Sequence, residues 1–120
     1  MERCVGQAED RHKMRKADLH IHSYYSTGRL RPKVIMAWAA EKGISFISIT
    51  DYNSVSGLEE AVTESNSLPV HVIQGIELPA VPADILAYFI DYKSEGLQKK
   101  LTEISRCFED EIIEQIESLR

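Results

Sequence analysis

The stretch ISFISIT, residues 44–50, is a run of apolar and β-branched residues of strand length. Such a run is typical of a strand in a parallel sheet, where helices cover both faces. A helical segment precedes it, because Pro32 suits the first turn of a helix and Gly43 suits the position just after its end. A helix followed at once by a buried strand indicates an α/β chain.

The rest of the chain alternates in the same way. We expect strands over 16–22, 44–50, 70–78 and 84–92, and helices over 32–42, 55–65 and 95–119. Apolar residues recur at three- and four-residue steps in the last segment, which predicts a long amphipathic helix. The sequence thus predicts an α/β fold of about four mostly parallel strands with flanking helices. Residues 1–15 are expected to be a polar leader, and residues 16–120 one domain.

Composition excludes several classes of protein. The chain has 120 residues, 43% hydrophobic and 28% charged, which is typical of one globular domain. A net charge of −5 disfavours general binding to nucleic acid or anionic membranes. No window has the apolar length of a membrane span, and the first fifteen residues lack the apolar run of a signal peptide. Cys4 and Cys107 are too few for a disulfide framework. We expect a cytoplasmic protein.

Polar residues gather where the predicted strands end. His20 and His22 end the first strand, Asp51 follows the second, and Glu77 ends the third. Asp84 stands at the start of the fourth. Because the carboxyl ends of parallel strands meet at one edge of a sheet, we expect these side chains to lie close together.

The residue types point to a metal. His20 and His22 alternate along a strand, so both imidazoles project from one face, and imidazole with carboxylate suits Zn, Mn or Fe. Two strand-end histidines that cap backbone groups are the alternative, since the HxH pattern alone is weak. Glu77 follows an apolar strand and a glycine, where a carboxylate needs a partner or solvent. Asp18 is a candidate to orient a ligand from behind, or else a surface acid.

Three segments then resemble a known family: DLHIHSYYSTGRLRP (18–32), AAEKGISFISITDYNSVSGLEEA (39–61) and VIQGIEL (72–78). In order and spacing they are similar to the PHP domain (polymerase and histidinol phosphatase), and the resemblance extends over roughly residues 16–92. The resemblance implies a distorted seven-stranded (βα) barrel with two or three metal ions at the carboxyl ends of its strands. It also implies hydrolysis of phosphate esters by a metal-activated water.

The resemblance also implies roles for individual residues. His20, His22 and Glu77 match metal ligands for Zn, Mn or Fe. Asp51 matches the aspartate of the T-D-H motif, a catalytic-site residue that acts in support of the ligands. Arg106 in the last helix matches an arginine that would contact phosphate, whereas a second arginine position holds Asp110.

Other positions depart from the family pattern. Thr27 stands where the family often has an aspartate, and Tyr52 stands where T-D-H ends in a metal-binding histidine. A neutral phenol with a pKa of about 10 is a poor replacement for imidazole. Asp84 stands where a histidine commonly opens the fourth strand, and an acid can still ligate. Tyr52 and Asp84 are therefore expected to be weak ligands or supports.

The family's later ligands lie beyond residue 120, so about half of the barrel has no counterpart here. Half a barrel has an open sheet edge and an uncovered apolar face. We expect a homo-oligomer or a complementing chain, or else a fragment of a longer chain. Two functions stay open: a metal-dependent phosphoesterase for a small phosphorylated substrate, with reduced or absent turnover, or a non-catalytic PHP-derived domain that acts through association. The sequence does not name the substrate.

Overall fold

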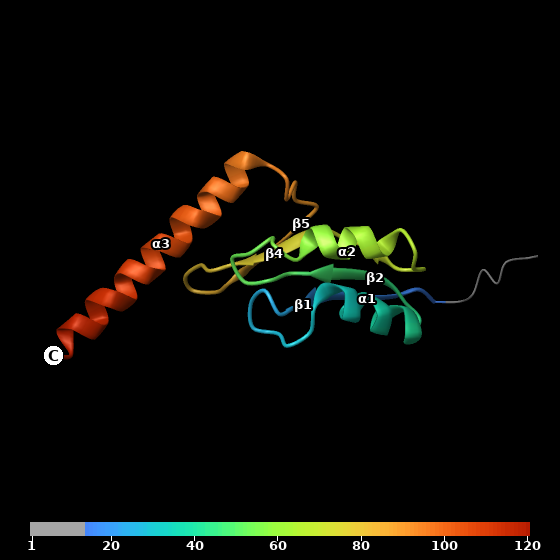
Figure 1. Ribbon diagram of the computed structural model, residues 1–120, viewed down its shortest axis with the longest axis horizontal. Coiled ribbons are helices and arrows are strands. Elements are labelled where there is room, and N and C mark those ends of the chain that lie inside the picture. The colour runs from blue at the N-terminus through green and yellow to red at the C-terminus, as the bar shows by residue number, and fades with distance from the viewer. Residues whose placement is uncertain (1–13) are drawn as a thin grey trace, which may run out of the picture.

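The computed structural model describes residues 14–120, so residues 1–13 of the expected leader, with Cys4, lie outside the described part. Its elements are β1 (Lys16–Ile21), α1 (Pro32–Glu41), β2 (Ile44–Ile49), α2 (Leu58–Ser65), β3 (His71–Val72), β4 (Gly75–Leu78), β5 (Ile85–Tyr88) and α3 (Glu95–Ser118) (Figure 1). The alternation of strands and helices confirms the predicted α/β class, with a long final helix.

Strands β1, β2 and β3 form a parallel sheet in that order, and β4 and β5 form a separate two-stranded sheet. The first half of the chain therefore follows the prediction closely. Helix α1 connects β1 to β2, and α2 connects β2 to β3, as parallel pairing requires. Gly43, at a φ of +68°, ends α1 in the left-handed conformation that glycine adopts without steric cost.

The expected third strand, 70–78, is two strands. The strand is interrupted after β3 at residues 73–74 and resumes as β4. The backbone nevertheless stays beside the continuation of β2, because Ile73 N–H donates to the carbonyl of Ile47 and Glu77 N–H to that of Asp51. An isolated parallel bridge between Tyr52 and Glu77 joins the two sheets.

The expected fourth strand, 84–92, covers only Ile85–Tyr88 and runs antiparallel to β4, so the expectation of a parallel partner there is wrong. A parallel connection needs a crossover of a dozen or more residues. The short, proline-containing loop between Leu78 and Ile85 can only turn the chain back. The turn brings Asp84 beside the end of β4.

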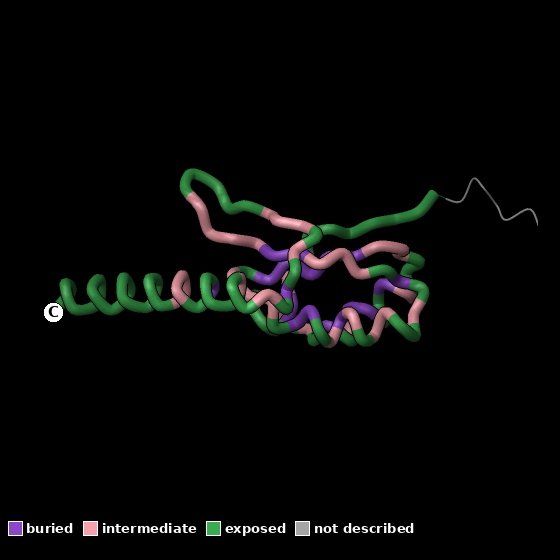
Figure 2. Tube along the Cα trace, turned by 90° about the horizontal axis from the view of Figure 1, so that it is seen from above, coloured by how far each residue is buried: buried purple, intermediate pink, exposed green. Residues whose placement is uncertain are grey.

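The core lies between the helices and β2. Met36 and Ile35 from α1, Ile47 from β2, and Leu58 and Ala61 from α2 are buried together. Figure 2 shows this buried centre and the exposed segments that lead away from it. In β1, every residue before Ile21 is exposed. Strand β1 is an edge strand of its sheet, paired with β2 on one side.

Helix α3 extends away from the sheets (Figure 1). It begins at Glu95, and the side chain of the preceding residue, Ser94, caps it by accepting from Leu97 N–H at 3.3 Å. A hydrogen bond joins α3 to the loop after β2: the side-chain amide of Asn53 donates to Ser105 Oγ at 2.9 Å. Leu101 is buried, whereas the apolar residues of the last turns are exposed: Phe108, Ile112, Ile113, Ile116 and Leu119. Among residues 14–120, no helix combines the length and apolar character needed to cross a membrane.

Candidate metal centre

Three predicted ligands converge at the carboxyl end of β1. Nε2 of His20 lies 3.2 Å from Nε2 of His22 and 3.1 Å from Oε2 of Glu77. Nε2 of His22 lies 2.6 Å from the same Glu77 oxygen. The side chains become more covered in the order His20, His22 and Glu77, with 50%, 23% and 13% exposed. The ligand atoms therefore face one another at a rim that solvent reaches.

The spacing of these atoms fits one small divalent cation. Ligand atoms about 2.1 Å from an ion would be about 3.0 Å apart at right angles and about 3.4 Å apart in a tetrahedral site. The three observed separations, from 2.6 to 3.2 Å, are close to the first value and slightly below the second. Two imidazoles and one carboxylate on one side of an ion leave its other positions open, as in catalytic rather than structural metal sites. The donor set suits Zn, Mn or Fe alike.

The backbone brings Glu77 to the histidines. Glu77 N–H donates to the carbonyl of Asp51 at 3.1 Å, and Asn53 N–H donates to the carbonyl of Glu77 at 2.8 Å. Gly75 allows this approach, since a Cβ atom there would overlap Ser48 Oγ. The glycine of the VIQGIEL segment is thus needed to seat β4, and with it Glu77, against β2.

Asp51 lies behind the cluster and does not belong to it. Its carboxylate is 2% exposed. It accepts from Ser23 N–H and Ser23 O–H at 2.6 Å each and from Ser26 O–H at 2.7 Å. The buried position agrees with a supporting role and leaves Asp51 no direct access to a substrate.

The sequence analysis did not identify Ser23 and Ser26, although both lie in the DLHIHSYYSTG segment. Ser26 Oγ also lies 3.1 Å from Nδ1 of His22. Their positions, one and four residues after His22, are visible in the sequence. The carboxylate that they contact is not, because Asp51 lies 28 and 25 residues further along the chain. Gly28 closes the same turn, because a Cβ there would overlap the His22 carbonyl.

The other predicted site residues lie around this centre. Asp18 accepts from the backbone N–H of His20 at 3.4 Å, so it contacts the backbone and not the ring. The Tyr52 hydroxyl donates to Asp84 Oδ1 at 3.4 Å. Partial desolvation, with the carboxylates of Asp84 and Glu77, raises the pKa of the Tyr52 phenol. Tyr52 therefore stays neutral at physiological pH and offers no anionic ligand.

Arg106 and Thr27 are both exposed, and within residues 14–120 neither forms an ion pair or a side-chain hydrogen bond. The structure therefore does not bring Arg106 into contact with the three ligands. His71 stacks on Phe46, with ring centroids 5.2 Å apart, and is not part of the cluster.

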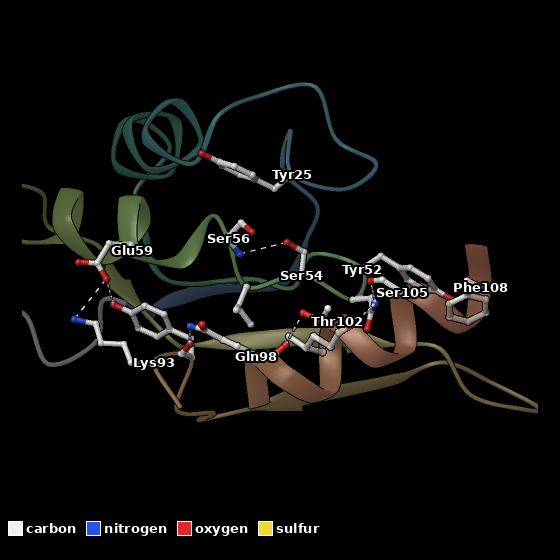
Figure 3. A pocket seen from close by; sticks show the side chains of 14 residues that line it. Tyr25, Tyr52, Ser54, Ser56, Glu59, Lys93, Gln98, Thr102, Ser105 and Phe108 are labelled. Atoms are coloured by element: carbon white, nitrogen blue, oxygen red, sulfur yellow. Dashed lines mark hydrogen bonds and ion pairs between the residues drawn. The ribbon is translucent and has the colours of Figure 1, made fainter. Parts of the chain in front are cut away.

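A groove of about 960 Å³ borders the centre, between the loop after β2 and helix α3 (Figure 3). Hydroxyl and amide side chains line much of it: Ser54, Ser56, Gln98, Thr102 and Ser105. Figure 3 shows Glu59 and Lys93 at one end and Tyr52 beside Phe108 at the other. Tyr52, at one end of the groove, also contacts Asp84 and pairs with Glu77, whereas His20, His22 and Glu77 do not line the groove.

The segments that form the site match a known family. The sequence of residues 18–116 matches the PHP domain. The chain belongs to the PHP domain family. The match confirms the resemblance and extends from within β1 almost to the end of α3.

Three curated relatives share 30–33% of aligned residues with this chain. An uncharacterized protein of Methanocaldococcus jannaschii is 32% identical, over 63% of this chain and 51% of its own. A 5′-3′ exoribonuclease of Haemophilus influenzae is 30% identical, over 53% of this chain and 23% of its own. A phosphoribosyl 1,2-cyclic phosphate 1,2-diphosphodiesterase of Eggerthella lenta is 33% identical, over 52% of this chain and 24% of its own. The chain thus spans about half of the first relative and about a quarter of the others.

A solved structure of an amidohydrolase from Chromobacterium violaceum, with bound sulfate and no metal, has the same fold. It superimposes with a TM-score of 0.68 and 27% identity over 74% of this chain and 33% of its own length. The similarity supports the interpretation of the fold as part of a PHP barrel.

Proposed function

We propose that the chain hydrolyses a phosphate ester with a divalent cation held by His20, His22 and Glu77. The observation that carries this proposal is the convergence of the three donor atoms to within 4.8 Å of one another. A cation bound there supplies Lewis-acid activation of the ester and of the attacking water. Zn, Mn and Fe are the candidates, because the donor set suits each of them.

The chain's own residues contribute position and charge. Glu77 supplies a negative charge that holds the cation between the two imidazoles, and Asp51 holds the turn that carries His22. The groove beside Tyr52 offers neutral hydroxyl and amide groups to the rest of a small phosphorylated substrate. Asp84 is a further candidate ligand. Arg106 would contact phosphate only if α3 moved closer to the centre.

We further propose that turnover is low compared with that of relatives that keep a metal-binding histidine at position 52. Tyr52, a neutral phenol, stands where the family pattern has that histidine. The alternative is a non-catalytic PHP domain that keeps one cation and acts through association. Tyr52 favours this alternative, because it reduces the number of ligands available for a second ion.

Hydrolysis of bis-p-nitrophenyl phosphate with added Mn²⁺ tests the proposal. We expect release of p-nitrophenol by the wild type above the level of a Glu77→Gln variant, whose carboxamide cannot hold the cation as firmly. His71→Ala is the matched control, because His71 is a histidine outside the cluster. Equal release by wild type and Glu77→Gln would contradict phosphoesterase activity and favour the non-catalytic domain.

We also propose that a second copy of the chain covers the exposed elements. The exposed apolar side of α3 is flanked by acidic residues, Glu109, Asp110, Glu111, Glu114 and Glu117. Exposed basic residues lie at the start of β1 and beyond both ends of α1: Arg15, Lys16, Arg29 and Lys42. Light scattering should give twice the monomer mass, and an Ile112→Glu/Ile116→Glu variant should give the monomer mass. A wild-type monomer at all concentrations would contradict self-association.

A further inference from the structure

Ser26 lies between a buried carboxylate and one of the candidate ligands. Its hydroxyl donates to Oδ1 of Asp51 at 2.7 Å, and its oxygen lies 3.1 Å from Nδ1 of His22. Asp51 also receives the N–H and the O–H of Ser23. Three donors directed at one carboxyl group are the pattern of an ionised carboxylate, which accepts hydrogen bonds only.

The direction of each hydrogen bond follows from counting protons. A serine hydroxyl has one proton, and Asp51 receives the proton of Ser26. Ser26 Oγ can therefore only accept from the ring of His22, so Nδ1 of His22 carries a hydrogen. The opposite arrangement would leave Ser26 Oγ and Asp51 Oδ1 as two acceptors 2.7 Å apart with no proton between them.

The consequence concerns the other ring nitrogen. With the Nδ1 hydrogen held by Ser26, Nε2 is the atom of His22 that offers a lone pair to a cation. Nε2 lies 2.6 Å from Oε2 of Glu77.

We infer that Ser26 is a positioning residue. Its hydroxyl links the carboxylate of Asp51 to Nδ1 of His22, holds the orientation of the ring and leaves Nε2 as the metal-binding atom. The inference rests on the metal site of the proposed function and adds a residue to it. His20 has no such support, since within residues 14–120 its ring bonds only through Nε2 and its side chain is 50% exposed. Ser26 therefore makes His22 the better anchored of the two histidines.

Zinc affinity of the full chain, measured by competition with a chromophoric chelator, tests this role. Partners behind a metal ligand typically change affinity by about 10- to 100-fold, so we expect a loss in that range for Ser26→Ala. Ser26→Thr keeps a hydroxyl and should restore most of the affinity. Ser23→Ala is the matched control: it removes another hydroxyl from Asp51 but leaves the link to His22. Unchanged affinity in Ser26→Ala, or an equal loss in Ser23→Ala, would overturn the inference.

The ring hydrogens of His22 give a second measurement that needs no variant of Ser26 and no metal. Long-range ¹H–¹⁵N correlation on the cation-free chain, with His22 assigned by its absence in His22→Ala, should show a proton on Nδ1. A neutral ring protonated at Nε2 alone would overturn the inference. If the wild type binds no zinc, the proposed function fails, while this spectrum still decides the role of Ser26.

Discussion

The hydroxyl of Tyr52 donates a hydrogen bond to Oδ1 of Asp84 at 3.4 Å, beside the carboxylate of Glu77. Tyr52 and Glu77 pair across a parallel bridge, so their side chains leave the same face of the sheet. A neutral phenol thus occupies the position next to the cluster that an imidazole could use. The centre is left with His20, His22 and Glu77 for one cation.

Replacing Tyr52 by histidine should enlarge the ligand set. We expect Tyr52→His to raise the number of zinc ions bound per chain, or to tighten the binding of the first several-fold, because imidazole is a ligand at neutral pH and phenol is not. Metal analysis after gel filtration measures the number. Tyr52→Phe, which removes only the hydroxyl, serves as control and should bind as the wild type does. Equal zinc content in Tyr52→His and Tyr52→Phe would contradict this view of the site.

Gly75 should be intolerant of any side chain. A Cβ atom at this position would overlap Ser48 Oγ and lie 3.0 Å from Thr50 Cγ2. Both neighbours are fully buried, so either they or β4 must shift. Overpacking of this kind costs about 1–3 kcal/mol, and we expect Gly75→Ala to lower the free energy of unfolding by that amount and to weaken zinc binding through Glu77.

Gly96 provides the matched control for Gly75. Its nearest neighbour to an added Cβ is Ser94 Oγ at 3.7 Å, and it lies in the first turn of α3. Gly96→Ala should leave zinc binding unchanged and stability equal or slightly higher, because alanine restricts the unfolded chain. Urea denaturation compares the two variants. A Gly75→Ala protein as stable as Gly96→Ala would show that β4 is not closely seated.

Alkaline pH should weaken the contact between α2 and the segment before α3. The Tyr92 hydroxyl donates to Glu59 at 2.6 Å, and this hydrogen bond, with burial of the ring, raises the pKa of Tyr92 to about 12. The unfolded chain has a tyrosine pKa of about 10. Because the folded pKa is the higher one, the stabilisation is complete below about pH 10 and is lost as the pH rises towards about 12.

The variant Tyr92→Phe lacks this contribution at every pH. We expect its melting temperature to be a few degrees below that of the wild type at pH 7, and the difference to shrink above about pH 10. Thermal unfolding at several pH values measures it. Tyr24→Phe is the control, since Tyr24 is 63% exposed, and it should match the wild type throughout. A constant difference between pH 7 and pH 11 would be inconsistent with the role of this hydrogen bond.

Local patterns were sufficient to predict the first part of the fold. The run at 44–50 became β2, with Ile47 and Ile49 at most 1% exposed, and proline and glycine placed the ends of α1 correctly. The alternation around His20 and His22 also predicted that both rings share one face. These features depend on neighbours along the chain, which the sequence displays directly.

The errors arose where distant segments decide the outcome. The break in the expected strand 70–78 follows from pairing with two different partners, first β2 and then β5. The antiparallel direction of β5 follows from the short loop before it, a length argument that the strand pattern alone does not contain. Ser23 and Ser26 gained significance only once folding placed Asp51 beside them.

The most direct test of the central claim is the zinc content of the purified chain, prepared without chelator and compared with three variants. We predict about one ion per chain in the wild type and in His71→Ala. The ion should be lost in His20→Ala/His22→Ala and in Glu77→Gln, because each removes a member of the cluster. A wild type without metal, or variants that keep it, would contradict the proposal that His20, His22 and Glu77 form a metal centre.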